Sequence, residues 1–358
     1  MKQKLLALLG IDVPVIQAPM AGVSTARLAA AVSNAGALGS IAVGAGTPAQ
    51  ARAAIADLHQ LTAKPFNVNV FTHRPARADA AREAEWLSWL GAHFREQASE
   101  APAALREIYT SFLVDEEMLE VLVAARPAVV SFHFGLPTAR QVESLHRAGI
   151  VLLGAATSVE EARAVEAAGI DAVVAQGIEA GGHRGVFDPD RPDPGLSTFT
   201  LVQLLRESVR IPIAAAGGIM DGYAIDAALR LGASAAQMGT AFILTPESSA
   251  TAHHRSLIQQ GEALRTEMTS VISGRPARGL VNRFFTEIGG AGHPPPPDYP
   301  IAYDVAKALH AAASRHGNND YSVNWAGQGF ALARAMPAAE LVRTLAAELA
   351  QARMNAPQ

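Results

Sequence analysis

A short repeated signal, glycine after alanine or leucine, divides this chain into regular units. The signal occurs at Ala35-Gly36, Ala148-Gly149, Ala168-Gly169 and Leu231-Gly232, each time between a helical stretch and an apolar run. Glycine suits the end of a helix because it adopts a left-handed backbone conformation without steric cost. The apolar run that follows is typical of a buried parallel strand, so the pattern predicts alternating helices and strands.

Eight apolar runs of strand length lie between residues 15 and 238. Eight alternating units in about 250 residues match the size of a TIM (β/α)8 barrel. A doubly wound open sheet uses the same alternation, but eight evenly spaced units favour a closed barrel. The predicted strands are Val15–Ala18, Leu38–Ala42, Phe66–Val70, Ala128–His133, Ile150–Gly154, Asp171–Ala175, Ile211–Ala215 and Ala235–Met238.

Two further segments do not fit a plain barrel and predict a helical cap. Residues 73–112 follow the third strand and carry a helical charge pattern, and residues 253–269 also have a helical pattern. We therefore predict a barrel over residues 1–245, with a helical insertion at about 73–112, and a helical cap with closing helices over 246–358. An apolar fraction of 49% with only 17% charged residues is enough to bury cores of this size.

Composition excludes several kinds of function. The net charge of −4 provides no basic surface for nucleic acid, and the absence of cysteine excludes disulfides, thiolate metal sites and cysteine nucleophiles. The apolar run near the N-terminus is soon broken by Asp12 and Pro14, so it is too short to span a membrane. We expect a cytoplasmic protein with neither a nucleic-acid nor a membrane partner, and the sequence leaves the oligomeric state open.

A glycine-rich stretch with one histidine, Gln176–Gly185, follows the sixth predicted strand. TIM-barrel enzymes carry their active sites at the carboxyl ends of the strands. Histidine is the side chain whose ordinary pKa lies closest to neutrality, and His183 stands at such a strand end. The alternative is a surface loop with a solvent-facing histidine. The position favours an active-site loop.

Two glycine-containing loops come where a TIM barrel commonly binds phosphate. Gly217 and Gly218 follow the seventh strand, and the segment Gln237–Thr240 ends the eighth. Backbone N–H groups at these positions can face an anion. The two loops together predict a ligand that carries a phosphate.

Three uncharged amides, Gln17, Asn69 and Gln176, stand at the carboxyl ends of predicted strands. An amide both donates and accepts hydrogen bonds, which suits a heterocycle of mixed donors and acceptors such as a flavin. The alternative is that an amide caps the strand backbone, which is more plausible for one of the three than for all of them.

Several segments together resemble the nitronate monooxygenases, formerly called 2-nitropropane dioxygenases. Two C-terminal segments, Gly290–Pro300 and Trp325–Gly329, resemble the bacterial class I branch of that family. The resemblance implies a TIM barrel that binds FMN without a covalent bond. It also implies oxidation of alkyl nitronates by O2 to nitrite and a carbonyl compound, with propionate 3-nitronate as the expected substrate. The other matching segments are Gln17–Gly22, Val32–Gly36, Phe66–Asn69, Ser131–Gly135, Gly181–Gly185 and Ala215–Gly218.

The resemblance also implies roles for single residues. His183 matches the active-site histidine of the family, and the backbone at Pro19, Met20 and Gly22 would pass under one face of the flavin. A nitronate arrives already deprotonated, so we expect His183 mainly to position the substrate rather than to act as a base. The positions that match FMN contacts are Asn69, Gln176, Gly181, Gly218, Gln237, Met238, Gly239 and Thr240.

His133 is a second catalytic candidate at a strand end. Strand alternation would place it on the face opposite Phe132 and Phe134, pointing into the barrel toward the cofactor. A buried core histidine is an equally good interpretation. Two histidines with no acidic cluster nearby make a poor metal site, so we expect no metal.

A predicted helix that starts at Pro300 places two functional groups on one face. Tyr303 and Lys307 are four residues apart, and Tyr299 stands just before the helix. A cation and two phenols above the barrel would suit a substrate that carries a carboxylate. The alternative is an exposed surface pair, and the resemblance favours the substrate-binding role.

Other functions fit part of the pattern. An FMN-dependent NAD(P)H:quinone reductase and a flavin-type enoyl-ACP reductase share the barrel and many of the glycines. IMP dehydrogenase and GMP reductase need a cysteine nucleophile, which this chain lacks. A flavin- or phosphate-binding protein without catalytic activity would keep the glycine loops but have no need of His183.

Overall fold

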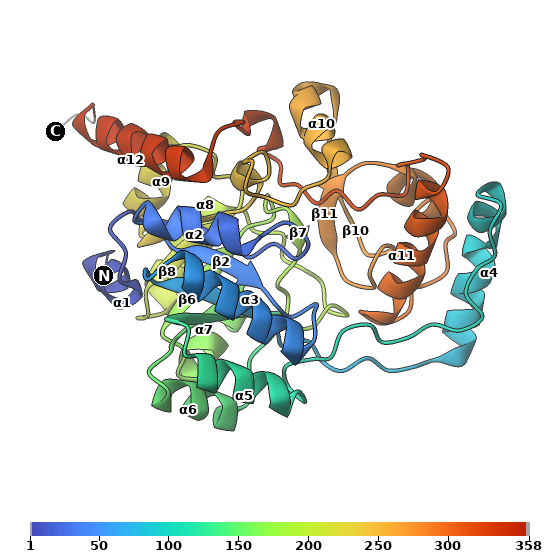
Figure 1. The fold of residues 1–358 in the computed structure, drawn as a ribbon, viewed down its shortest axis with the longest axis horizontal. Helices are drawn as coiled ribbons and strands as arrows, with labels where there is room; N and C mark the ends of the chain where they lie inside the picture. The colour runs from blue at the N-terminus through green and yellow to red at the C-terminus, as the bar shows by residue number, and fades with distance from the viewer. Residues whose placement is uncertain (1, 356–358) are drawn as a thin grey trace.

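The computed structural model describes residues 2–355 and contains a barrel of eight parallel strands (Figure 1). Neighbouring strands follow the order β1-β9-β8-β6-β5-β4-β3-β2, and a bridge between Ile16 and Leu38 joins β1 to the residue before β2. This bridge closes the sheet and confirms the predicted TIM barrel. The strands, each overlapping one predicted run, are β1 (Val15–Gln17), β2 (Gly39–Ala42), β3 (Phe66–Phe71), β4 (Val129–His133), β5 (Val151–Ala156), β6 (Ala172–Gln176), β8 (Ile213–Ala216) and β9 (Ala235–Met238).

Helices surround the barrel, and polar side chains fix where they begin. Thr25 Oγ1 accepts a hydrogen bond from the N–H of Leu28 at the start of α2, and Thr47 with Gln50 forms a capping box at the start of α3. These contacts satisfy N–H groups that a helix start leaves without partners. The surrounding helices are α2 (Ala26–Asn34), α3 (Pro48–Leu61), α5 (Glu116–Ala125), α6 (Ala139–Arg147), α7 (Val159–Ala167), α8 (Thr198–Ser208), α9 (Gly222–Leu231) and α12 (Ala338–Met354).

The N-terminal end of the barrel is closed by α1 (Lys2–Leu9). Its Leu5 and Leu9 are fully buried in a cluster with Leu38, Val129 and Ala235, which stand at or beside the starts of strands. The opposite end, where the strands finish, faces the cap (Figure 1). The fold therefore leaves the carboxyl ends of the strands for the functional site.

The cap has a hydrophobic core of its own, formed mainly by α4 (Ala80–Glu96) and α11 (Ile301–Ser314). The fully buried side chain of Trp86 belongs to this core together with Val305 and Leu309. Figure 1 shows both helices on the side of the barrel opposite α1. In residues 73–112 the structure has one helix, α4, and long irregular segments that connect it to the barrel.

The helix predicted over residues 253–269 is wrong in its second half. Helix α10 (Ala252–Gln260) ends at Gly261, whose φ of +59° does not continue a helix. Residues Thr266–Thr269 instead form β10, which pairs antiparallel with β11 (Ala277–Leu280), and β11 pairs with the two-residue strand β7 (Gly182–His183). The helical pattern failed because this pairing with distant residues overrides local preference.

The remaining elements are short turns of helix. They are η1 (Thr240–Phe242), η2 (Gly261–Ala263), η3 (Phe284–Ile288), which is a π-helix, and η4 (Phe330–Leu332). Helix α12 packs against α2 and α9 of the barrel, whereas α11 packs against α4 of the cap. Among the helices of residues 2–355, none combines the length and apolar character that a membrane crossing requires.

Candidate active site

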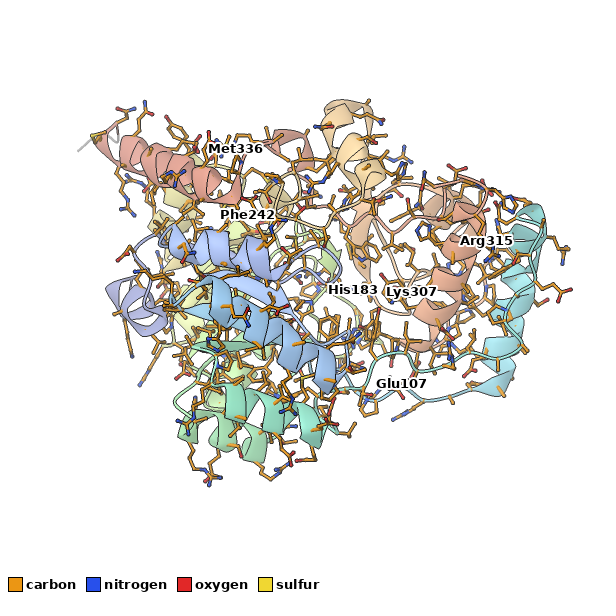
Figure 2. The ribbon with its side chains drawn as sticks, in the orientation of Figure 1. Glu107, His183, Phe242, Lys307, Arg315 and Met336 are labelled. Atoms are coloured by element: carbon orange, nitrogen blue, oxygen red, sulfur yellow. The ribbon has the colours of Figure 1, made fainter. Side chains whose placement is uncertain are left out.

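His183 lies on β7, in the small antiparallel sheet at the carboxyl ends of the barrel strands. Its backbone carbonyl oxygen accepts hydrogen bonds from His133 Nε2 at 3.1 Å and from Gln176 Nε2 at 3.0 Å. Its ring Nε2 lies 2.8 Å from the hydroxyl oxygen of Ser273. Two barrel strands and the turn before β11 thus fix the backbone and ring of this histidine. Figure 2 shows His183 between the barrel and the cap.

Aromatic rings surround His183 and form what we call the His183 chamber. The ring centres of Phe134, Tyr299, Tyr303 and Trp325 lie 5.2–6.1 Å from the centre of the His183 ring. Phe134 comes from the end of β4, the two tyrosines come from the start of α11, and Trp325 comes from the C-terminal region. The structure therefore brings the predicted Tyr299 and Tyr303 to the predicted histidine.

Lys307 faces the same chamber from α11 (Figure 2). Its ammonium group donates a hydrogen bond to the hydroxyl of Tyr109 and lies 4.7 and 5.0 Å from the ring centres of Tyr109 and Tyr303. His183 and Tyr303 are half-buried, whereas Lys307 is exposed to solvent. Tyr109 was missed in the sequence because it stands in an irregular segment with no periodic pattern.

Burial makes both chamber histidines weak bases. The pKa of His183 falls to about 3 because of burial, with smaller effects of His133 and Arg275, and burial lowers the pKa of His133 to about 4. Both rings are therefore neutral at neutral pH. The positive charges near the chamber are Lys307 and Arg275, whose pKa is lowered by burial to about 10 and which stays protonated.

Phe134 does not follow the strand alternation that we expected. Its φ is +80°, in the left-handed region that a bulky side chain rarely adopts. This backbone turn places its ring 4.5 Å from the His133 ring, centre to centre, and not on the opposite face. Left-handed backbone at such a residue costs about 1–3 kcal/mol and is found most often at functional sites. Phe132 does lie on the strand face opposite His133, as expected, and its ring packs on that of Phe112.

The loops after β8 and β9 present backbone donors without partners. Within residues 2–355, the N–H groups of Gly217, Gly218, Gly239 and Thr240 have no hydrogen-bond acceptor. Gly217 and Gly218 have φ values of +125° and +69°, and a Cβ on Gly217 would lie 2.6 Å from Thr198 Oγ1. Glycine is therefore required at Gly217 for both conformation and space. The arrangement suits an anion, as predicted from the sequence.

The backbone at Pro19–Gly22 reaches the second of these loops. A Cβ placed on Gly239 would lie 3.4 Å from Met20 Sδ, so the two segments are neighbours. Gly22 has a φ of +76° with open space around its Cβ position, and it is therefore required by conformation rather than by a close contact. Gly181 differs, because a Cβ there would lie 2.4 Å from the backbone nitrogen of Gly327.

The strand-end amides differ in whether their side chains already form hydrogen bonds with the protein. Gln17 Oε1 accepts from Ser40 N at 2.8 Å, and Gln176 Oε1 accepts from Gly185 N at 2.7 Å, so both amides hold the protein backbone. Asn69 donates to Ser131, but its Oδ1 has no protein partner within residues 2–355. The side-chain amide of Gln237 likewise has no protein partner in that range. The capping alternative thus describes both Gln17 and Gln176, and the contact of Gln176 with a cofactor stays a prediction.

Two residues near the chamber were not found from the sequence. Arg275, in the turn before β11, is 3% exposed, and its guanidinium carbon lies 4.6 Å from the ring centre of Phe134. His73 is fully buried with its ring 5.0 Å from that of Tyr299. Neither position carries a local signal, since both are defined by tertiary packing. Residues 2–355 contain no group of three histidine, aspartate or glutamate residues arranged to hold a metal ion.

The chain is similar to known proteins over nearly its whole length. Residues 2–348 match the family described as nitronate monooxygenase. The chain is 57% identical to nitronate monooxygenases from Pseudomonas aeruginosa and Paraburkholderia phytofirmans, covering 98% of this chain in each case and 99% and 96% of the relatives.

Solved structures share the fold over the whole chain. The structure of a nitroalkane oxidase from Streptomyces ansochromogenes superposes with a TM-score of 0.90 at 42% identity, covering 98% of this chain and 99% of that one. FabK from Thermotoga maritima gives a TM-score of 0.75 at 29% identity, covering 98% and 97%. The family match over residues 2–348 and the 57% identity to the two named relatives identify the family. The chain belongs to the nitronate monooxygenase family of oxidoreductases.

Proposed function

We propose that this enzyme oxidises alkyl nitronates with O2, releases nitrite and a carbonyl compound, and uses FMN as its cofactor. We also propose that propionate 3-nitronate, which carries a carboxylate besides the nitronate, is a substrate. One observation carries the proposal: the neutral ring of His183 and the ammonium group of Lys307 line the same aromatic chamber. Family membership supports the reaction class.

The loops after β8 and β9 fit the phosphate of FMN. Their four N–H groups without protein acceptors, from Gly217, Gly218, Gly239 and Thr240, are the donors that a phosphate needs. The free Oδ1 of Asn69 and the side-chain amide of Gln237 would hold the flavin ring, and the backbone near Met20 would lie against it. When bound, FMN accepts electrons from the substrate and delivers them to oxygen.

His183 fits a positioning role better than the role of a base. A group whose conjugate acid has a pKa of about 3 is too weak to remove the α-proton of a neutral nitroalkane efficiently. Within residues 2–355 its Nδ1 has no protein partner, so this atom is available to the substrate. The Ser273 hydroxyl lies 2.8 Å from Nε2 and 3.2 Å from the carbonyl oxygen of Arg275, and its single proton serves one of these two acceptors. When that proton is directed at Nε2, the ring carries its own proton on Nδ1 and donates it to a nitronate oxygen.

Lys307 supplies the charge for a second anionic group. Its side chain is held by the hydroxyl of Tyr109 and by the faces of Tyr109 and Tyr303. Burial lowers its pKa, and the neighbouring Asp304 opposes that effect. A carboxylate that binds here would gain a charge-assisted hydrogen bond, which is stronger than a neutral one. The chamber therefore favours a nitronate with a carboxylate over a plain alkyl nitronate.

Anaerobic mixing tests the function directly. The purified enzyme loaded with FMN is mixed without oxygen with ethyl nitronate, propionate 3-nitronate or NADH, and the flavin absorbance is followed. We expect rapid bleaching by both nitronates, and nitrite release with return of the absorbance when oxygen is admitted. Bleaching by NADH alone would overturn the proposal in favour of a reductase.

A further inference from the structure

Arg275 is a buried cation without a carboxylate partner. Its side chain is 3% exposed, and one of its terminal nitrogens, Nη2, donates to the carbonyl oxygens of Val186 and Phe187. Its Nε is buried and has no hydrogen-bond partner in the described part of the chain. Its Nη1 forms no hydrogen bond with the residues that the structure describes, and no acidic side chain among them forms an ion pair with it.

An uncompensated buried charge is costly, so its presence calls for an explanation. Arginine is almost never fully buried unless it is paired. The ring of Phe134, 4.6 Å from the guanidinium carbon, offsets part of the cost by a cation–π contact, as do the two carbonyl oxygens. None of these contacts carries a negative charge. The guanidinium therefore retains a capacity to bind an anion.

Arg275 lines a pocket of about 240 Å³ that opens at the surface. The other two arginines of its wall are already paired: Arg74 lies 3.2 Å from Asp190, and Arg82 lies 3.2 Å from Asp298. Among the residues that the structure describes, Arg275 is thus the arginine of this wall that forms no ion pair, although Asp188, paired with Arg191, lines the same wall and stabilises its charge at longer range. The volume is below that of pockets for drug-sized ligands, so the pocket suits a small ligand.

We propose that this pocket binds a small oxyanion of the nitrite or carboxylate type against Arg275, at a site separate from the His183 chamber. The planar guanidinium matches an anion that presents two oxygens. Neither His183 nor Lys307 belongs to the pocket wall, whereas Tyr299 belongs to both sites. The bound anion would lie behind Tyr299, whose ring centre is 5.5 Å from that of His183.

Crystals of the unaltered enzyme test the site without any mutation. Selenite is used as the probe because it is a small oxyanion whose selenium is located by its anomalous scattering. We expect selenite in the pocket with its oxygens within hydrogen-bond distance of the Arg275 guanidinium. Selenite found only beside Lys307, or nowhere in the pocket, would refute the proposal.

A titration in solution gives an independent measure. Thermal unfolding is followed at constant ionic strength with increasing sodium nitrite or sodium propionate. We expect a saturable rise in Tm with at least one anion, weakened about tenfold or more in Arg275→Met and less in Arg275→Lys, which keeps the charge. The matched control Arg74→Lys alters a paired arginine of the same wall but keeps its charge, and it should leave the titration nearly unchanged.

The two arms of the titration identify the anion. Tighter binding of nitrite points to the released anion of the proposed reaction, and tighter binding of propionate points to a carboxylate. Identical curves for the unaltered enzyme and a folded Arg275→Met would refute the site. These experiments need no turnover, so their failure is distinguishable from a failure of nitronate oxidation.

Discussion

His183 occupies a chamber that keeps its imidazole uncharged. Its pKa of about 3 results mainly from burial and further from His133 and Arg275. Because the ring is neutral above that pKa, its charge does not change near neutrality. We expect kcat/KM for a nitronate to show no His183 ionisation between about pH 5 and 8, where an ordinary histidine would titrate.

The pH profile of a folded His183→Asn variant provides the comparison. Asparagine keeps a donor near the position of the ring but cannot titrate. If the unaltered enzyme showed an inflection near pH 6.5 that His183→Asn lost, His183 would be titrating in the working range. That result would contradict the neutral positioning role and restore the histidine as a proton-transfer group.

Lys307 should discriminate between substrates. Lys307→Met keeps an apolar stem of similar length but removes the charge beside Tyr109 and Tyr303. We expect KM for propionate 3-nitronate to rise about tenfold or more, and KM for ethyl nitronate to change much less, because only the former has a carboxylate. Steady-state oxygen consumption with both substrates measures the difference. Equal changes for the two substrates would remove Lys307 from carboxylate recognition.

At the scale of elements, the strand β7 depends on a close approach between two backbone segments. A Cβ on Gly181 would lie 2.4 Å from the backbone nitrogen of Gly327. Gly181→Ala should therefore push the 326–327 segment away from the loop that carries His183. Gly327 also donates its N–H to Thr240 Oγ1 at 3.0 Å, which links this contact to the loop after β9 that is proposed to bind phosphate. We expect Gly181→Ala to reduce the FMN content of the purified protein several-fold.

Gly39→Ala is a matched control on another element. A Cβ on Gly39, at the start of β2, would lie 1.9 Å from the backbone carbonyl oxygen of Ala29 in α2. This position is at the N-terminal end of the barrel strands, opposite the loops, so the same substitution should lower stability but leave FMN content near normal. The flavin-to-protein absorbance ratio measures both variants. Equal loss of FMN in both would show that general destabilisation, and not the β7 loop, is responsible.

Elements differ in how well the sequence predicts them, and their contacts explain why. Each barrel strand is a continuous apolar run because both of its faces are buried, and a glycine often precedes it, so the sequence signal is local. Strand β7 has two residues and pairs with β11, whose Ala277 lies opposite His183. A pairing between positions so far apart leaves no local pattern.

The residues of the candidate site also differ in how well the sequence predicts them. His183, Tyr299, Tyr303 and Lys307 were predicted because a strand end, a helix face and the family resemblance marked them. Tyr109 and Arg275 stand in irregular segments, and only the folded chain brings them to the chamber. Phe134 was placed on the wrong face because strand alternation cannot anticipate a φ of +80°.

At the scale of the whole molecule, the cap and the barrel bury titratable groups between them. Burial lowers the pKa values of His73, His133 and His254 to about 4, and that of His183 to about 3. Below about pH 6.5 the unfolded chain therefore binds protons that the folded protein does not. Stability from these groups is fully present at pH 7 and is lost as the pH falls from 6.5 toward 4. One such histidine accounts for about 2 kcal/mol between pH 7 and pH 5.

His73 allows this prediction to be tested with one substitution. Its ring is fully buried against Phe134 and Tyr299, and neither ring nitrogen has a hydrogen-bond partner among residues 2–355. His73→Phe keeps the aromatic packing but removes the titratable group. We expect the free energy of unfolding, measured by urea at pH 7 and pH 5, to fall less for His73→Phe than for the unaltered chain, by about 2 kcal/mol. An identical pH dependence in both proteins would show that His73 is protonated in the folded state.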